Sequence, residues 1–287
     1  MIKVILLGNA QDAGAPQAGC RCANCSTARA QAKPKWVSAL GLIDTEAGAY
    51  FLIDATPDFR EQFHLLQMAA GGGRFSRQAG FGGILITHAH IGHYTGLIHL
   101  GYEAMAAREV PLFGSSRLLK FLRANAPWQQ LVEQNNISLR EFTPDDWIQL
   151  TPGLAVQPIQ VPHRAEWSDT VGFVARGSDG MRSLLYLPDI DAWDGWDRPV
   201  REVVASVSVA LLDGSFFDPA ELPGRDIAKI GHPLVTDTVA RLRGLTTDVR
   251  FIHLNHSNPL HQPGRERTWL QAQGSFSVGA AGDSWDL

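Results

Sequence analysis

The segment Thr87-His88-Ala89-His90-Ile91-Gly92-His93 follows the short apolar run Ile84-Leu85-Ile86 and decides how the rest of the chain is interpreted. It contains three of the chain's 10 histidines. Residues two apart in extended backbone point to the same side, so His88 and His90 can converge on one ion, and His93 returns through the next turn. Imidazole is the commonest protein ligand of zinc and also binds iron and manganese. A polar loop facing water is the alternative, but a triplet directly after a buried strand favours a metal site.

A second cluster, Cys20-Arg21-Cys22-Ala23-Asn24-Cys25, contains all 3 cysteines of the chain. An odd number with no partner elsewhere argues against a disulfide framework. The pattern Cys-x-Cys-x-x-Cys instead places three thiolates where they can bind one tetrahedral zinc, with a histidine as the natural fourth ligand. Gly14, Pro16 and Gly19 favour a zinc-binding loop over residues 14–26 rather than a helix. The alternative is three reduced thiols in a loop.

The composition is that of a compact globular protein, with 45% hydrophobic and 19% charged residues among 287. A formal charge of −4 and the lack of any Lys/Arg run give no support to nucleic-acid or membrane partners. No apolar segment approaches the ~20 residues of a membrane span. Reduced cysteines, and a start that reads as a strand rather than an export signal, indicate the cytoplasm. We expect one domain over 1–287, and a homodimer remains open.

Strand-like and helical segments succeed one another without a clear linker, which favours a single α/β domain. The predicted strands are Val4–Leu7, Tyr50–Ile53, Gly83–Thr87, Leu154–Val161, Thr170–Val174, Ser183–Leu187, Val207–Leu212 and Val249–Leu254. The predicted helices are Asp58–Met68, Gly96–Ala107, Ser115–Ala126 and Thr236–Arg243. Asp145–Ile148 and Pro152-Gly153 resemble a turn before a hairpin, and the segment Gly71–Gly83, rich in glycine and arginine, reads as a surface loop.

Further candidate ligands stand where predicted strands end. His163 follows Ile159-Gln160-Val161-Pro162, Asp189 follows the strand that ends at Leu187, and His253 closes another strand. Loops at strand ends are where rigid scaffolds usually present catalytic groups. A lone acid there is more often a turn former, but two histidines and an acid after a histidine-rich loop indicate one shared site.

This order of residues resembles the metallo-β-lactamase superfamily, whose fold is a four-layer αββα sandwich with metals at its edge. The resemblance implies that His88, His90 and His163 hold a catalytic zinc, manganese or iron ion, and that Asp189 bridges it to a second position made by His93 and His253. Asp54, in Phe51-Leu-Ile-Asp54-Ala-Thr, matches an acid that supports the ligands of this fold.

Within that superfamily the chain most resembles the pyrroloquinoline quinone biosynthesis protein B (PqqB) family. The shared features are Leu7-Gly8, Pro16-Gln17, Leu212-Asp213-Gly214-Ser215-Phe216-Phe217, Gly231-His232, Ile252-His253-Leu254-Asn255-His256-Ser257-Asn258-Pro259 and Gly282-Asp283-Ser284-Trp285. The cysteine cluster and the His253/His256 pair are also similar to the PhnP-type phosphodiesterases. We assign His256 to the structural zinc of Cys20, Cys22 and Cys25; a surface polar residue is the alternative.

The chain departs from the PqqB pattern in the histidine-rich segment Thr87–His93. That pattern replaces the first two histidines and keeps an acid before the third, whereas this chain has His88 and His90 and carries Gly92 at the acid position. Asp189 stands where PqqB proteins tend to have glycine. The predicted site therefore resembles the metal sites of hydrolases more than that of PqqB proteins. With Gly92, the second position has one fewer carboxylate and relies on Asp189, so we expect it to bind its ion weakly and Gly92→Asp to strengthen it. The alternative is that Asp191 or Asp213 replaces the missing carboxylate.

His232 and Asp189 are the expected catalytic residues. In related hydrolases a histidine at the place of His232 serves as general acid or contacts a substrate phosphate; capping a helix or filling the core is the alternative. Asp213 either orients a histidine or forms a turn.

Two enzymatic functions fit these residues. The first is a metal-dependent hydrolase, in which a metal lowers the pKa of water toward ~7 for attack on a phosphoester or acyl bond of a small molecule. The second is iron-dependent oxidation of a peptide-derived or tyrosine-like substrate, since His93, His253 and Asp189 have the composition of a two-histidine-one-carboxylate triad. A metal-stabilised binding protein is a third interpretation, but it needs fewer ligands than this chain carries.

Overall fold

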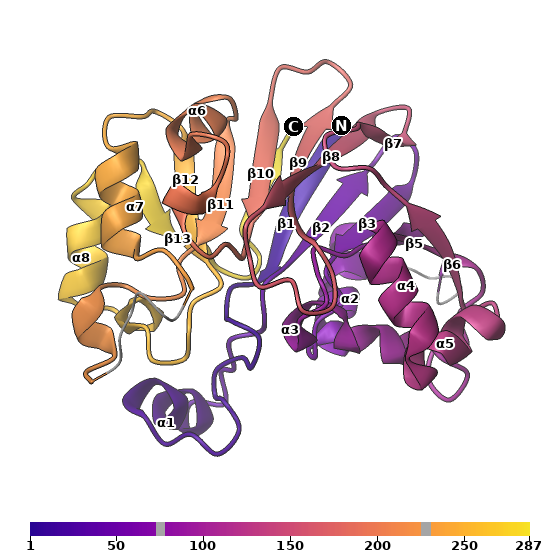
Figure 1. The fold of residues 1–287 in the computed structure, drawn as a ribbon, viewed down its shortest axis with the longest axis horizontal. Coiled ribbons are helices and arrows are strands. Elements are labelled where there is room, and N and C mark those ends of the chain that lie inside the picture. Colours follow the sequence, from indigo (N-terminus) through magenta and orange to yellow (C-terminus); the bar gives the residue numbers. More distant parts are fainter. Residues whose placement is uncertain (73–77, 225–230) are drawn as a thin grey trace.

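The computed structural model describes residues 1–72, 78–224 and 231–287, and in this part of the chain two seven-stranded sheets pack face to face (Figure 1). The first sheet has the order β14 (Ser284–Asp286), β1 (Ile2–Gly8), β2 (Ala39–Asp44), β3 (Ala49–Ile53), β4 (Phe81–Leu85), β5 (Val110–Gly114) and β6 (Ile137–Glu141). The second has the order β13 (Phe276–Val278), β12 (Asp248–Ile252), β11 (Val209–Asp213), β10 (Ser183–Leu187), β9 (Thr170–Gly177), β8 (Leu154–Val161) and β7 (Ile148–Thr151).

Each sheet is antiparallel on one side and parallel on the other. In the first sheet β1, β2 and β3 are antiparallel, and β3 to β6 are parallel. In the second sheet β7 to β10 are antiparallel, and β10 to β13 are parallel. The parallel strands all end at the same edge of their sheet, so the loops that follow them gather there.

Successive residues of the strands point into two different cores, which explains the nearly continuous apolar runs of the sequence. In β1, Val4 and Leu6 lie in the core between the sheets, whereas Ile5 and Leu7 pack against the outer helices. Strands that are buried on both faces lose the polar alternation of a half-exposed strand. The middle of the sandwich is therefore apolar on both sides of each sheet, and the polar groups are confined to its edges.

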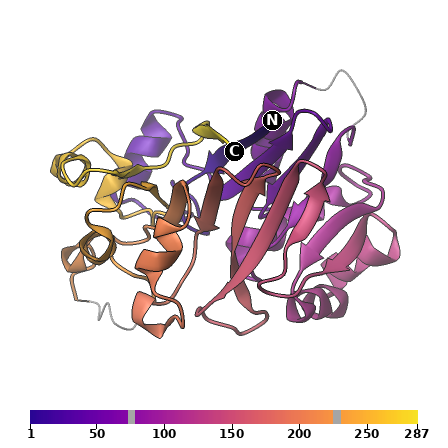
Figure 2. The ribbon, with the colours of Figure 1, turned by 90° about the horizontal axis from the view of Figure 1, so that it is seen from above.

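Helices cover the two outer faces, so that the four-layer αββα sandwich predicted from the sequence is confirmed (Figures 1 and 2). On the first sheet these are α2 (Phe59–Ala69), α3 (Ile91–Tyr94), the 3-10 helix η1 (Thr95–Leu100), α4 (Ser116–Ala124) and α5 (Ala126–Glu133). On the second they are α6 (Val200–Ala205), α7 (Val235–Leu242) and α8 (Arg265–Gln271). Short 3-10 helices lie at Trp193–Gly195, Pro219–Glu221 and Pro259–His261. Helix α1 (Ala23–Ala30) projects from the lower edge of the sandwich in Figure 1. Within the described residues, no helix combines the length and the apolar character that a membrane crossing requires.

All eight predicted strands overlap strands of the structure, namely β1, β3, β4 and β8 to β12, and three of the four predicted helices overlap α2, α4 and α7. Pro152-Gly153 does join β7 to β8 in a hairpin. Of the predicted loop Gly71–Gly83, residues 73–77 lie outside the described residues and 81–83 belong to β4.

Two expectations of local structure are wrong. The predicted helix Gly96–Ala107 is a 3-10 helix only to Leu100, after which the chain closes into a loop: Ala106 N–H donates to Gly101 O at 2.9 Å, with φ of 47° at Ala106. The cysteine segment is not a loop throughout, because α1 begins at Ala23 and therefore includes Cys25. The alanine-rich sequence of α1 outweighs the glycines and proline that precede it.

Candidate metal centre

The predicted active-site residues gather at the edge of the sandwich where strands of both sheets end. The histidine-rich segment follows β4, His163 follows β8, Asp189 follows β10 and His253 follows β12. All are almost fully buried except His90, so their polar atoms face one another rather than bulk water. Among the described residues, they form three overlapping groups with Asp12, Asp213 and His232, each of four ligand atoms within 4.8 Å of one another.

The first group consists of His88, His90, His163 and Asp189. His88 Nε2 lies 2.9 Å and His163 Nε2 3.2 Å from His90 Nδ1. The carboxylate of Asp189 lies 3.3 Å from His88 Nε2 and 3.2 Å from His163 Nε2. Three imidazole nitrogens and one carboxylate around a common point match the ligand chemistry of zinc and other divalent metals.

The second group consists of Asp12, His93, Asp189 and His253. The Nε2 atoms of His93 and His253 lie 3.5 Å and 3.4 Å from Asp189 Oδ2. Although both nitrogens and Asp12 Oδ1 are buried, none has a hydrogen-bond partner of acceptable geometry. Buried polar atoms of native proteins are normally paired, so three unpaired atoms facing one point fit a bound cation. Asp189 belongs to both groups, which makes it the group suited to bridge two ions.

Asp54 orients Thr87 and His93 of the histidine-rich segment, which is the supporting role that the family resemblance implies. Its carboxylate accepts hydrogen bonds from the Thr87 N–H at 2.8 Å and the Thr87 hydroxyl at 3.0 Å, and it lies 2.8 Å from His93 Nδ1. Its φ of 67° is in the left-handed region, which non-glycine residues seldom occupy and which is often found at functional sites. Burial opposes a charge on His93, but the carboxylates of Asp54, Asp12 and Asp189 together outweigh it and raise the pKa of His93 well above its usual value. The carboxylates around His93 thus carry more negative charge than one protonated ring balances, and this excess favours a bound cation.

His232 lies beside these two groups and forms the third one with Asp189, Asp213 and His253. Its Nδ1 is 2.8 Å from Asp213 Oδ2 and 3.4 Å from Asp189 Oδ1, and its Nε2 is 3.4 Å from the side-chain amide of Gln11. Burial opposes protonation of the ring, but Asp213 more than compensates, and the pKa of His232 is raised to about 9. Asp213 thus orients His232, which is one of the two roles considered for it, and also accepts the N–H of Ser215 at 2.9 Å.

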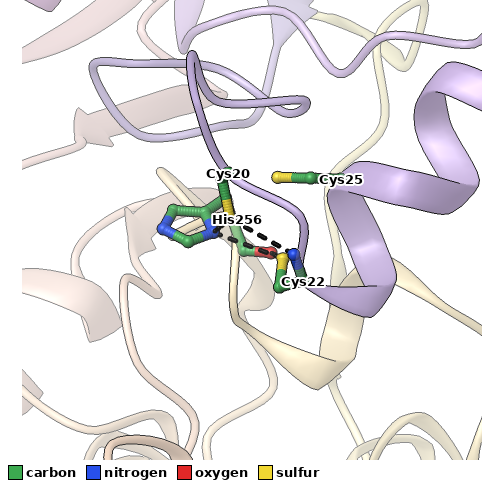
Figure 3. A group of neighbouring side chains, drawn as sticks. All are labelled: Cys20, Cys22, Cys25 and His256. Carbon is green, nitrogen blue, oxygen red and sulfur yellow. Dashed lines mark hydrogen bonds between the residues drawn. The ribbon is translucent and has the colours of Figure 1, made fainter.

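The three cysteines and His256 form a separate group, again within 4.8 Å. Figure 3 shows the imidazole of His256 beside the sulfur atoms of Cys20 and Cys22, each 3.5 Å from His256 Nδ1, while Cys25 approaches from helix α1. The backbone N–H of Gln17 donates to Cys25 Sγ at 3.3 Å. Three sulfur atoms and one imidazole nitrogen are a ligand set of structural zinc sites. His253 and His256 therefore serve different groups, and the φ of 58° at His253 marks the turn that separates them.

Two residues of the site were missed by the sequence reasoning: Asp12 joins the second group, and Glu166 Oε2 lies 3.3 Å from His90 Nε2. Asp191, considered as a substitute carboxylate of the second position, instead has its Oδ1 2.8 Å from His163 Nδ1. Asp12 stands just after β1, so the strand-end rule that singled out Asp189 could have found it. The expectation that the second position relies on Asp189 alone for a carboxylate is wrong, since Asp12 lies there as well.

Comparison with known proteins agrees with this architecture. The family model described as the Beta-lactamase superfamily domain matches residues 49–267. Because the match covers most of the chain, this protein belongs to that superfamily, and its two packed sheets have the metallo-β-lactamase fold.

Its relatives confirm the resemblance to PqqB. Coenzyme PQQ synthesis protein B of Ruegeria pomeroyi is 27% identical over 296 residues, covering 95% of this chain and 96% of the relative. The structure of Zn²⁺-bound PqqB from Methylobacterium extorquens has a TM-score of 0.82 at 22% identity, covering 99% of this chain and 100% of that chain. A diphosphatase from the PhnP family has a TM-score of 0.69 at 21% identity, covering 99% and 96%.

Proposed function

We propose that this protein is a metal-dependent hydrolase that cleaves a phosphoester or acyl bond of a small molecule. The observation that carries the proposal is the pair of buried ligand groups that share Asp189, one of them with three histidines. His88, His90 and His163 would hold one ion, His93 and His253 another, and Asp189 would bridge them. Bound divalent ions supply Lewis acidity and lower the pKa of water toward ~7.

The side chains of the site would position the reactants and move protons. Asp189 would fix the spacing of the two positions, and Asp54 and Asp191 would hold the His93 and His163 rings in place. His232 would keep one proton on Nδ1, against Asp213, and donate a second proton from Nε2 to the leaving group. General acid catalysis of this kind typically contributes ~10²–10⁴-fold to a rate.

The substrate would enter beside Gln11. A groove of about 420 Å³ is lined by Gln11, Gln17, Phe216, Leu222 and Asn255, together with His256 and Ser257. Phe216 also packs against His232, with ring centroids 5.9 Å apart. Amide and apolar side chains of this kind suit a small organic group attached to the scissile bond.

A direct test is hydrolysis of chromogenic esters by the metal-loaded protein. Bis(p-nitrophenyl) phosphate reports phosphodiester cleavage, and p-nitrophenyl acetate reports acyl cleavage, each with added Zn²⁺ or Mn²⁺. We expect metal-dependent turnover of at least one of them, lost in His88→Ala. Asp145→Asn, at an exposed acid that pairs with Arg198, is the matched control and should keep full activity.

Oxidation is the second candidate, and two observations favour it. The relatives that match nearly the whole chain are PQQ synthesis proteins, and the second group offers two histidines with carboxylates, as non-haem iron sites do. Consumption of O₂ by the Fe²⁺-loaded protein with a tyrosine-containing peptide, without turnover of either ester, would overturn the hydrolase proposal in favour of this one.

A further inference from the structure

The second ligand group contains a carboxylate that comes from far outside the histidine-rich segment. Asp12 lies in the turn after β1, and its Oδ1 is 3.2 Å from His93 Nε2 and 3.8 Å from His253 Nε2. All three atoms are buried and lack a hydrogen-bond partner. Asp12 also lies outside residues 49–267, the range that the superfamily model matches.

Gly92 makes room for this carboxylate. A Cβ built on Gly92 would lie 2.2 Å from Asp12 Oδ1 and 2.6 Å from Asp12 Cα, far inside the closest approach of real atoms. The φ of Gly92 is not positive, so its backbone does not require glycine. Glycine at position 92 is therefore explained by the space that Asp12 occupies. Any side chain at position 92 would collide with Asp12 in its present place.

The turn that carries Asp12 is fixed to the loop that carries His253. Gln11 N–H donates to Leu254 O at 2.9 Å, Leu254 N–H donates to Asn9 O at 2.8 Å, and Gly14 N–H donates to Gln11 O at 2.7 Å. The carboxylate thus approaches His253 from an anchored backbone, as a preformed ligand does.

We propose that Asp12 supplies the carboxylate ligand of the second metal position, in place of an acid at position 92. The inference rests on the proposed function in one respect, namely that the site binds active-site ions. It reverses the expectation drawn from the sequence: Gly92→Asp displaces Asp12, backbone and side chain alike, and weakens the second position.

Mn²⁺ binding to four proteins tests this assignment. The wild type, Asp12→Asn, Gly92→Asp and the control variant Asp58→Asn are stripped of active-site ions under conditions that leave the cysteine zinc in place. Each is dialysed against increasing Mn²⁺, bound manganese per chain is measured by elemental analysis, and electron paramagnetic resonance separates coupled pairs from single ions. Asp58→Asn is the matched control, because Asp58 accepts the Val37 N–H at 2.8 Å beside the same loop without reaching the site.

We expect two coupled Mn²⁺ ions per chain in the wild type and in Asp58→Asn. Asp12→Asn and Gly92→Asp should keep one ion and bind the second about 100-fold or more weakly, at or beyond the upper end of the 10–100-fold losses seen when residues supporting a metal ligand are replaced. Circular dichroism melting checks folding, and if Gly92→Asp does not fold, Asp12→Asn decides the question.

Two results would overturn the inference in distinguishable ways. A coupled pair of undiminished affinity in Asp12→Asn shows that Asp12 is not a ligand while leaving the hydrolase proposal intact. A wild type that binds no Mn²⁺ or Zn²⁺ beyond the cysteine zinc overturns the hydrolase proposal and this inference together.

Discussion

Replacing Asp54 by asparagine should weaken metal binding, because it changes which nitrogen of the His93 ring carries the proton. Asparagine has nearly the same size and tolerates the φ of 67°, so the backbone can stay in place. It has one acceptor oxygen where aspartate has two, however, and Asp54 serves both Thr87 and His93 Nδ1. In either orientation of the amide, one N–H group faces another, and a charge-assisted buried hydrogen bond worth ~1.5–3 kcal/mol is lost.

The same change alters which nitrogen of His93 is protonated. Asp54 accepts the proton on Nδ1 and leaves Nε2 free to bind a metal. An amide N–H facing Nδ1 favours the other tautomer, with the proton on Nε2. Loss of such a supporting partner weakens metal binding by about 10–100-fold, which is ~1.4–2.7 kcal/mol.

The assay is urea unfolding at pH 7, with and without saturating Mn²⁺, on protein that retains its cysteine zinc. Since ligand binding adds to the stability of the folded state, the destabilisation by Asp54→Asn should be larger with Mn²⁺ than without it. Asp44→Asn is the matched control: Asp44 is a buried acid at the end of β2 that accepts the N–H groups of Glu46 and Ala47, and its cost should not depend on Mn²⁺. If Asp54→Asn lowers the free energy of unfolding by the same amount with and without Mn²⁺, the tautomer argument is refuted.

Three further outcomes can be measured. Cys22→Ser should lose about one zinc per chain and melt at a lower temperature, because zinc binding and folding are coupled; unchanged zinc and melting would contradict the cysteine site. The double variant His88→Ala/His90→Ala should lose metal from the first position and all hydrolysis while retaining the cysteine zinc, and full metal content in both sites would show that the ligands are misassigned. Burial raises the pKa of Glu221 from 4.5 to about 7. Because this folded-state pKa lies above the unfolded one, wild-type stability relative to Glu221→Gln should fall as pH rises from 4.5 to 7 and level off above; a pH-independent difference would contradict the shift.

The sequence predicted those parts of the fold whose signal is local. Apolar runs identified strands in both sheets, and the strand-end positions of His163, Asp189 and His253 indicated one shared site. Strand β2 was missed because Gly41 reads as a strand breaker, yet a Cβ at Gly41 would lie 2.5 Å from Leu66 Cδ1 of helix α2. The glycine is there because the helix packs closely against the strand, and that contact depends on tertiary structure.

The same limit explains why Asp12 was overlooked. Its place in the site depends on the hydrogen bonds that join residues 9–11 to Leu254, a contact between the two ends of the chain that no local pattern reveals. The sequence analysis interpreted Gly92 as a missing ligand, whereas in the structure a Cβ at Gly92 would lie 2.2 Å from Asp12 Oδ1.

The pairing of the first residues with Leu254 has a consequence for how the protein is made. Asp12 and the three cysteines are translated long before their partners His253 and His256. Contacts between such distant segments form late and slowly. The thiols of a nascent chain therefore stay without their histidine partner until residue 256 has been made, and a chain that stops before residue 253 cannot complete either group of side chains.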